Sequence, residues 1–213
     1  MAFIDVQNDV MTILNRRDLT NTQLLSFLDK GARRINREIK CPAQEGTISH
    51  TFDGTEAYPG RLLVPGDMLQ VISIYLNDAS NQRTLIKRDK ATVMVAAQTV
   101  ATPAYYYREG ATYILGPQPP NTTTLYIDYY KDATGLSAPT DTNWLTDAAP
   151  DLLSYAALTY ASDFFMDERA DKWESRYQQI AASIQGLADD DELHDASIGA
   201  AYNTDPIDYY PYQ

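Results

Sequence analysis

The chain has 213 residues, a formal net charge of −12, 44% hydrophobic residues and a single cysteine. This composition fits a globular protein with one domain and an insertion, or with two small domains. One cysteine excludes an intrachain disulfide and a thiolate metal cluster. The acidic balance disfavours tight nucleic-acid binding through phosphate contacts, and no run of about 18 apolar residues is present to span a membrane.

The charge is unevenly distributed along the chain. Residues 1–43 carry seven basic and five acidic groups, whereas residues 148–213 carry three basic and thirteen acidic groups. The N-terminal segment is therefore the local exception to an acidic protein, and the C-terminal segment carries most of the excess negative charge.

Two amphipathic helices are predicted in the N-terminal segment. The first begins near Phe3 and ends near Arg17. The second follows Thr20, which forms a capping-box pattern with Gln23, and continues to about Ile39. The polar side of the second helix is rich in basic residues, which are Lys30, Arg33, Arg34, Arg37 and Lys40. Two interpretations stay open: a solvated helix face, or a surface that docks an acidic partner or the acidic helix of a neighbouring subunit.

After Cys41 the apolar pattern changes to a period of two residues, which is typical of β-strands. We expect a short helix over 89–98 and a loop over 132–147. The strands are expected over 47–52, 62–64, 69–76, 84–87, 104–108, 111–115 and 122–130. In the last of these strands we expect Leu125, Ile127 and Tyr129 to share one face.

Residues 150–187 predict two further helices with a tight break between them. Pro150 suits the first helical position, because its missing N–H has no partner there. The apolar face of this helix is expected to run from Leu152 to Phe164. The next helix is expected to have Asp167 as its N-cap, with Glu168 and Asp171 in its acidic first turn, and an apolar stripe that continues to Leu187.

Residues 188–213 are acidic at first and then rich in tyrosine. Backbone ordering costs about 1–2 kcal/mol per residue, which such a segment cannot offset alone. Tyrosine, however, offers large contact area with little rotamer entropy to lose. The pattern favours an arm that orders against another protein, with a solubilising tail as the alternative. The arm residues expected to make contact are Ile198, Tyr202, Pro206, Ile207, Tyr209, Tyr210 and Tyr212.

The element order helix, helix, strands, helix, helix predicts an α+β protein. The N- and C-terminal helix pairs can close one helical bundle only if the ends of the insertion lie close together. We therefore expect a helical bundle domain from 1–43 and 148–190, an inserted antiparallel β domain from 44–147, and an extended C-terminal arm from 191–213.

The sequence contains no recognisable catalytic or cofactor-binding set. His50 lies in a predicted strand and His194 lies near Glu192 without a second histidine, so neither indicates a base or a metal site. Cys41 follows Lys40 but has no obvious histidine partner. We expect no enzymatic activity, no cofactor and no metal.

Several stretches, taken in order and spacing, resemble the head-to-tail adaptor (connector or neck ring) proteins of short-tailed and related bacteriophages. They are Gly31-Ala32-Arg33-Arg34 with residues up to 38, and residues 63–71, 113–119, 125–130, 142–158, 167–169 and 173–177. The set covers most of residues 20–187.

The resemblance implies a structural virion protein of the neck, made in the host cytoplasm. It implies a homo-oligomeric ring, usually of twelve copies, that joins the portal protein to the tail nozzle protein. Double-stranded DNA would pass through the lumen without specific binding, and the C-terminal arm would dock on the portal. The alternative is a tyrosine-rich binding module of a phage tail that recognises carbohydrate or the host wall.

Overall fold

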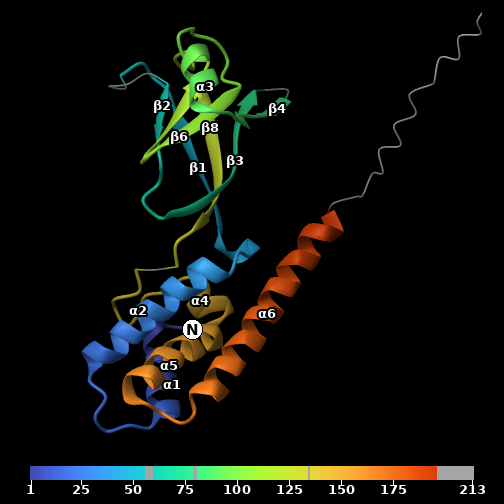
Figure 1. The fold of residues 1–213 in the computed structure, drawn as a ribbon. Helices are drawn as coiled ribbons and strands as arrows, with labels where there is room; N and C mark the ends of the chain where they lie inside the picture. The colour runs from blue at the N-terminus through green and yellow to red at the C-terminus, as the bar shows by residue number, and fades with distance from the viewer. Residues whose placement is uncertain (56–59, 79–80, 134, 196–213) are drawn as a thin grey trace, which may run out of the picture.

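The computed structural model describes residues 1–55, 60–78, 81–133 and 135–195, without the side chains of 78, 81 and 190–195. Helices and antiparallel sheets make up separate parts of the molecule, which confirms the predicted α+β class (Figure 1). Most of the predicted arm, residues 196–213, lies outside the described residues.

Five helices pack around one hydrophobic cluster in the lower part of Figure 1. The central helix is α5, which contacts the other four. Its side chains Leu152, Leu153, Ala156 and Ala157 are fully buried. The helices are α1 (Phe3–Leu14), α2 (Asn21–Glu38), α4 (Trp144–Ala148), α5 (Pro150–Phe165) and α6 (Ala170–Asp195).

Local sequence signals explain where these helices begin and end. The Thr20 hydroxyl accepts from the Gln23 N–H at 3.3 Å, and the Gln23 side chain accepts from the Thr20 N–H at 2.9 Å, which confirms the predicted capping box. Pro150 occupies the first position of α5, as predicted. Met166 then ends α5 in the left-handed region with φ 50°.

Four details of the predicted helices were wrong. Helix α6 begins at Ala170, so the predicted N-cap Asp167 lies in the turn before it, where its carboxylate accepts from the Arg169 N–H. Phe164 and Leu187 were expected in the apolar stripes but are 57% and 65% exposed. Residues 191–195, expected in the arm, continue α6.

The fourth detail concerns residues 132–147, which were predicted as a loop, whereas helix α4 begins within them at Trp144. Asn143 caps it, because its side-chain oxygen accepts from the N–H groups of Leu145 at 3.0 Å and Thr146 at 3.2 Å. A helix of 5 residues offers too short a stretch for its period to stand out in the sequence.

The residues between the helix pairs form two four-stranded sheets, in the orders β1-β8-β3-β4 and β2-β7-β6-β5. The helix α3 (Lys90–Ala96) lies at the far end of this β domain (Figure 1). A short 3-10 helix, η1 (Pro42–Gln44), precedes the sheets. The strands are β1 (Glu45–Thr51), β2 (Arg61–Leu63), β3 (Met68–Asp78), β4 (Asn81–Thr84), β5 (Ile86–Lys87), β6 (Tyr105–Glu109), β7 (Thr112–Gly116) and β8 (Thr124–Lys131).

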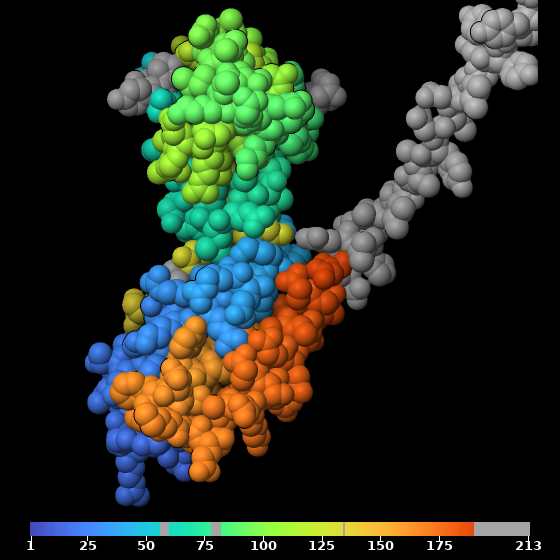
Figure 2. Space-filling model, in the orientation of Figure 1, coloured from blue at the N-terminus to red at the C-terminus, as the bar shows by residue number. Residues whose placement is uncertain are grey.

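The two sheets enclose a second hydrophobic cluster. Leu125, Ile127 and Tyr129 of β8 are buried in it, as the alternation predicted, together with Tyr113 and Leu115 of β7. This cluster shares no buried residue with the cluster of the helical part. Figure 2 shows the β domain standing on one end of the helical part.

The predicted strand 84–87 is divided between the two sheets. Leu85 donates its N–H to the Ile74 carbonyl of β3 at 2.8 Å, and Ile86 donates to the Ala104 carbonyl at 2.9 Å. The chain thus passes from one sheet to the other at Leu85, and β5 pairs parallel to β6. The expected purely antiparallel arrangement is corrected at this one pair of strands.

Candidate functional site

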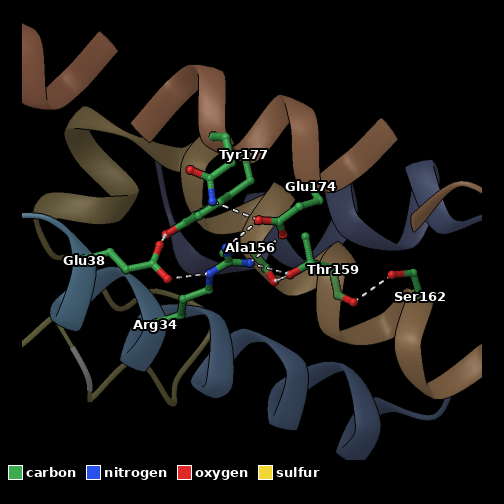
Figure 3. Close-up of polar contacts among 8 residues, drawn as sticks. Arg34, Glu38, Ala156, Thr159, Ser162, Glu174 and Tyr177 are labelled. Atoms are coloured by element: carbon green, nitrogen blue, oxygen red, sulfur yellow. Dashed lines mark hydrogen bonds and ion pairs between the residues drawn. The ribbon is translucent and has the colours of Figure 1, made fainter. Parts of the chain in front are cut away.

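A polar network centred on Arg34 joins three helices of the bundle (Figure 3). The Arg34 guanidinium donates two bonds to the Glu174 carboxylate of α6, at 2.6 and 2.7 Å, and one to Glu38 at 2.9 Å. It also donates to the Thr159 hydroxyl of α5 at 3.4 Å. The Tyr177 hydroxyl donates to the second oxygen of Glu38 at 2.6 Å, which closes the network.

The charges of this network stabilise one another. The hydrogen bond with Glu174 raises the pKa of Arg34, and the same bond lowers the pKa of the Glu174 carboxyl. Burial, and then the bond to Glu38, raises the pKa of Tyr177, so the phenol stays protonated and donates. The Arg34 guanidinium also lies 4.0 Å from the centre of the Tyr177 ring. The network fastens α6 to α2 and α5.

Sequence reasoning missed the partners in this network. Arg34 was expected on a basic outer face, whereas its side chain is only 14% exposed because α6 covers it. Glu174 lies 140 residues away along the chain, so no local spacing linked the two residues. Tyr177 falls within the helix whose apolar stripe was predicted to continue to Leu187, and that pattern gave no sign of its bond to Glu38.

The other predicted basic residues are placed differently from one another. Arg33 is exposed and pairs with Asp29 one helical turn away at 2.9 Å. Lys30 and Arg37 are also exposed. Lys40 is half-buried and donates to the Asn36 carbonyl at 2.6 Å, and burial lowers its pKa. Lys30, Arg33 and Arg37 are therefore the members of the predicted surface that face outward.

The predicted acidic residues lie in the turn between α5 and α6 and at the start of α6. Asp167 accepts from the Arg169 guanidinium at 2.8 and 2.9 Å, and Arg169 also donates to the carbonyl oxygens of Ile13 and Leu14. Arg169 thus connects this turn to the end of α1. Glu168 and Asp171 are exposed.

The Asp167–Arg169 pair makes the stability of this turn depend on pH. The hydrogen bond from Arg169 lowers the pKa of Asp167 from 3.8 to about 2. A carboxyl with a depressed pKa stabilises the fold above its unfolded pKa, and that contribution is lost as the pH falls to the folded pKa. We expect the unfolding free energies of the parent protein and Asp167→Asn to differ above about pH 4 and to converge towards pH 2. Asp171→Asn removes an exposed carboxyl nearby and is the control. If the unfolding free energies of the parent protein and Asp167→Asn differed by the same amount at every pH, this expectation would be contradicted.

Large exposed apolar side chains occur in both parts of the described chain. In the helical part they include Phe164 and Met166 at the turn between α5 and α6, and Leu187 of α6. In the β domain they include Leu63 of β2 and Val95 of α3. They are spread over several elements, so burial alone singles out no one contact surface.

The described part of the chain holds few groups suited to metal binding or nucleophilic chemistry. No group of three or more His, Cys, Asp or Glu side chains that could hold a metal occurs among the residues described. Cys41 is buried and burial raises the pKa of its thiol, which disfavours the reactive thiolate. Within the same residues, no helix has the length and apolar character needed to cross a bilayer.

The chain thus consists of two separately packed parts, and the Arg34 network attaches its last described helix, α6, to the bundle. The sequence matches the family described as SU10 adaptor protein over residues 1–201, and the chain belongs to this family of phage head-to-tail adaptors. The family confirms the resemblance and assigns the chain a structural role as a phage adaptor. No curated protein matches the chain.

Proposed function

We propose that this chain forms a homo-oligomeric ring in the neck of a virion, which joins the portal protein to the tail nozzle protein. The observation that carries this proposal is the match to the SU10 adaptor family over residues 1–201, together with the two separate hydrophobic cores of the chain. A connector needs one docking surface for each neighbour, and a helical part and a β domain with separate cores can supply one each.

The net charge supports a role around DNA. At a net charge of −12, the surface of the chain repels phosphate overall. A ring of such subunits surrounds double-stranded DNA without binding it specifically, so the DNA can move through the lumen. The ring of about twelve copies and the DNA channel are part of this proposal.

The ring contact is proposed to use the outward-facing basic residues of α2. Lys30, Arg33 and Arg37 would meet acidic residues of the next subunit, such as Glu168 in the turn before α6 and Asp171 in its first turn, both of which are exposed. Such a contact joins two different surfaces, and contacts of this kind close into rings when the rotation between subunits permits it. Arg34 and Lys40 are occupied within the subunit and are left out of this contact.

Charge reversal tests this contact. We expect Arg33→Glu combined with Arg37→Glu to weaken ring assembly by about tenfold or more, because like charges would then face each other. Sedimentation velocity over a range of protein concentrations measures the effect. Lys87→Glu combined with Arg88→Glu changes the same charge on the β domain and serves as the control. Equal assembly of both double variants would refute the α2 contact.

The C-terminal arm is proposed to extend the subunit onto a neighbouring protein, the portal being the candidate implied by the family resemblance. The arm residues lie outside the described part of the chain, so this role rests on their composition. Removal of residues 205–213 is expected to weaken binding to portal protein while the helical content of residues 1–195 is unchanged.

A second candidate function is recognition of carbohydrate by the β domain. It is favoured by Tyr75 and Tyr126, whose rings stack 5.4 Å apart on the outer face of the first sheet. Glycan-array binding by the full chain tests this function, with Tyr75→Ala as the variant that should lose binding. Glycan binding by a chain that never joins a portal would favour this module over the adaptor ring.

A further inference from the structure

The outer face of the sheet β1-β8-β3-β4 carries mainly hydroxyl, phenol and amide groups. Its inner face packs on the core between the sheets, so the side chains on alternate positions point outward. The register places together on the outer face Thr47, Ser49 and Thr51 of β1, Thr124, Tyr126 and Asp128 of β8, Ser73, Tyr75 and Asn77 of β3, and Gln82 and Thr84 of β4. Asp128 is the one charged residue among them, so this part of the face contains a carboxylate and no cation.

Asp128 is half-buried, and the groups that bond to its carboxylate are hydroxyls. The Thr47 hydroxyl donates to one carboxylate oxygen at 2.7 Å, and the Ser73 hydroxyl donates to the other at 2.9 Å. Burial, and then the charge of Asp128, raises the pKa of Tyr75, whose phenol therefore lies near the same carboxylate. None of the ion pairs formed by the described residues includes Asp128.

These bonds leave hydrogen-bond acceptors facing outward. A serine or threonine hydroxyl has one proton and two lone pairs. The protons of Thr47 and Ser73 are directed to Asp128, so their oxygens offer only lone pairs to another molecule. The carboxylate adds further lone pairs and a negative charge. A group that binds here must therefore bring several donors and a positive charge.

The neighbours of Asp128 favour a guanidinium over an ammonium. Arginine presents its N–H donors in a plane, whereas lysine is a compact point charge. The rings of Tyr75 and Tyr126 stack 5.4 Å apart on the same face, and aromatic rings attract cations, arginine more often than lysine. Ile72 is an extra residue where the pairing of β3 with β8 shifts, and it is 42% exposed beside Ser73. Such an apolar side chain can cover the aliphatic stem of an arginine.

We propose that the face around Asp128 docks an arginine side chain of the portal protein. The inference rests on the proposed function, and it assigns one of the two docking surfaces of the connector. Charge complementarity is the reason for the arginine, because the partner brings the cation that Asp128 lacks in the described part of the chain. Tyrosine, serine and asparagine, which recur on this face, are typical of surfaces that bind proteins.

The position of α6 is the reason for assigning the portal to this domain. The upper end of α6 lies beside the base of the β domain (Figure 1). The arm that we propose to reach the portal starts from that end. The β domain is therefore the part of the subunit that we place next to the portal.

Removal of the charge at Asp128 tests this proposal. Binding of the full chain to purified portal protein, and separately to purified tail nozzle protein, is measured by biolayer interferometry. Asp128→Asn keeps the shape of the side chain and removes its charge. We expect this variant to raise the Kd for the portal by about tenfold or more, and to leave the Kd for the nozzle protein within about twofold of the parent value.

A lysine at position 47 provides a second variant that supplies the cation from within the chain. Thr47 is exposed and directly opposite Asp128 in the register of β1 and β8. Opposite charges on paired strands stabilise a sheet, so Thr47→Lys should keep the fold and still lose portal binding by about tenfold or more. Thr51→Lys adds the same charge to the same strand opposite Thr124, and its portal binding should stay within about twofold of the parent value.

The partner's arginine is identified from the portal side. Each surface arginine of the portal is replaced by lysine in turn. One of these portal variants should bind the parent chain about fivefold or more weakly, yet bind Asp128→Asn no more weakly than the unchanged portal does, because the pair is already broken there. A scan in which no such variant occurs would overturn the arginine.

The outcomes separate the docking site from the proposed function. If Asp128→Asn bound the portal as the parent does, or lost affinity for both proteins equally, the docking site alone would be overturned. A loss toward the nozzle protein instead would overturn the assigned partner. Equal losses for Thr47→Lys and Thr51→Lys would overturn the role of Asp128. Failure of the parent to bind either protein would overturn the proposed function, and the docking site with it.

Discussion

Arg34→Gln is expected to lower the unfolding free energy of the helical part by about 2–3 kcal/mol. Removal of the guanidinium leaves the Glu174 carboxylate of α6 and the Glu38 carboxylate of α2 near each other without the cation that bonds to both. Breaking a buried ion pair costs about 3–5 kcal/mol, and the partial exposure of Glu174 reduces this figure. Urea unfolding followed by tryptophan fluorescence reports the effect, because both tryptophans, Trp144 and Trp173, lie in the helical part.

Arg33→Gln is the matched control for this prediction. Arg33 precedes Arg34 on the same helix, but its side chain is 62% exposed and pairs with Asp29 on the surface. Such a pair contributes less than about 0.5–1 kcal/mol. Equal losses for the two variants would show that the network of Figure 3 does not fasten α6.

Gly31→Val should destabilise the bundle by a similar amount, about 1–3 kcal/mol. A Cβ at Gly31 would lie 3.0 Å from the backbone nitrogen of Ala157 and 3.2 Å from the carbonyl carbon of Ala156. The two helices α2 and α5 would have to separate, and backbone atoms cannot move aside as a side chain can. The same urea titration measures the loss.

Gly186→Ala gives the contrasting case. Gly186 lies in α6, where an added Cβ meets no atom within 4 Å. Alanine is favoured over glycine in a helix by about 1 kcal/mol, so this variant should be unchanged or more stable. Similar destabilisation at both glycines would mean that helix propensity, rather than the close approach of α2 and α5, decides the outcome.

The fold could be predicted from sequence wherever local signals agreed with burial. The Thr20–Gln23 capping box, Pro150 at the start of α5 and the alternation of Leu125, Ile127 and Tyr129 were all found in the structure. Each of these signals depends on residues within a few positions of one another, so the sequence displays it directly.

Contacts between distant elements could not be predicted in the same way. The bond between Arg34 and Glu174, and the crossing of the chain between sheets at Leu85, depend on packing that no periodicity encodes. The basic face of α2 was predicted as a whole, but α6 covers Arg34 and leaves Arg33 and Arg37 outside.

The fold and the family together describe a structural protein that acts through contacts with other proteins. The Arg34 network holds α6 in place, and α6 carries the chain to the point where the C-terminal arm begins. The attachment of α6 to the bundle therefore sets the position from which the arm starts. This links the stability of the bundle to the assembly that we propose.

The proposed ring between portal and tail can be seen directly by electron microscopy of the purified protein mixed with its portal protein. We expect closed rings seated coaxially on the portal, with the β domains and the bundles at two distinct levels. Chains that stay monomeric, and that leave the portal bare at high concentration, would contradict it.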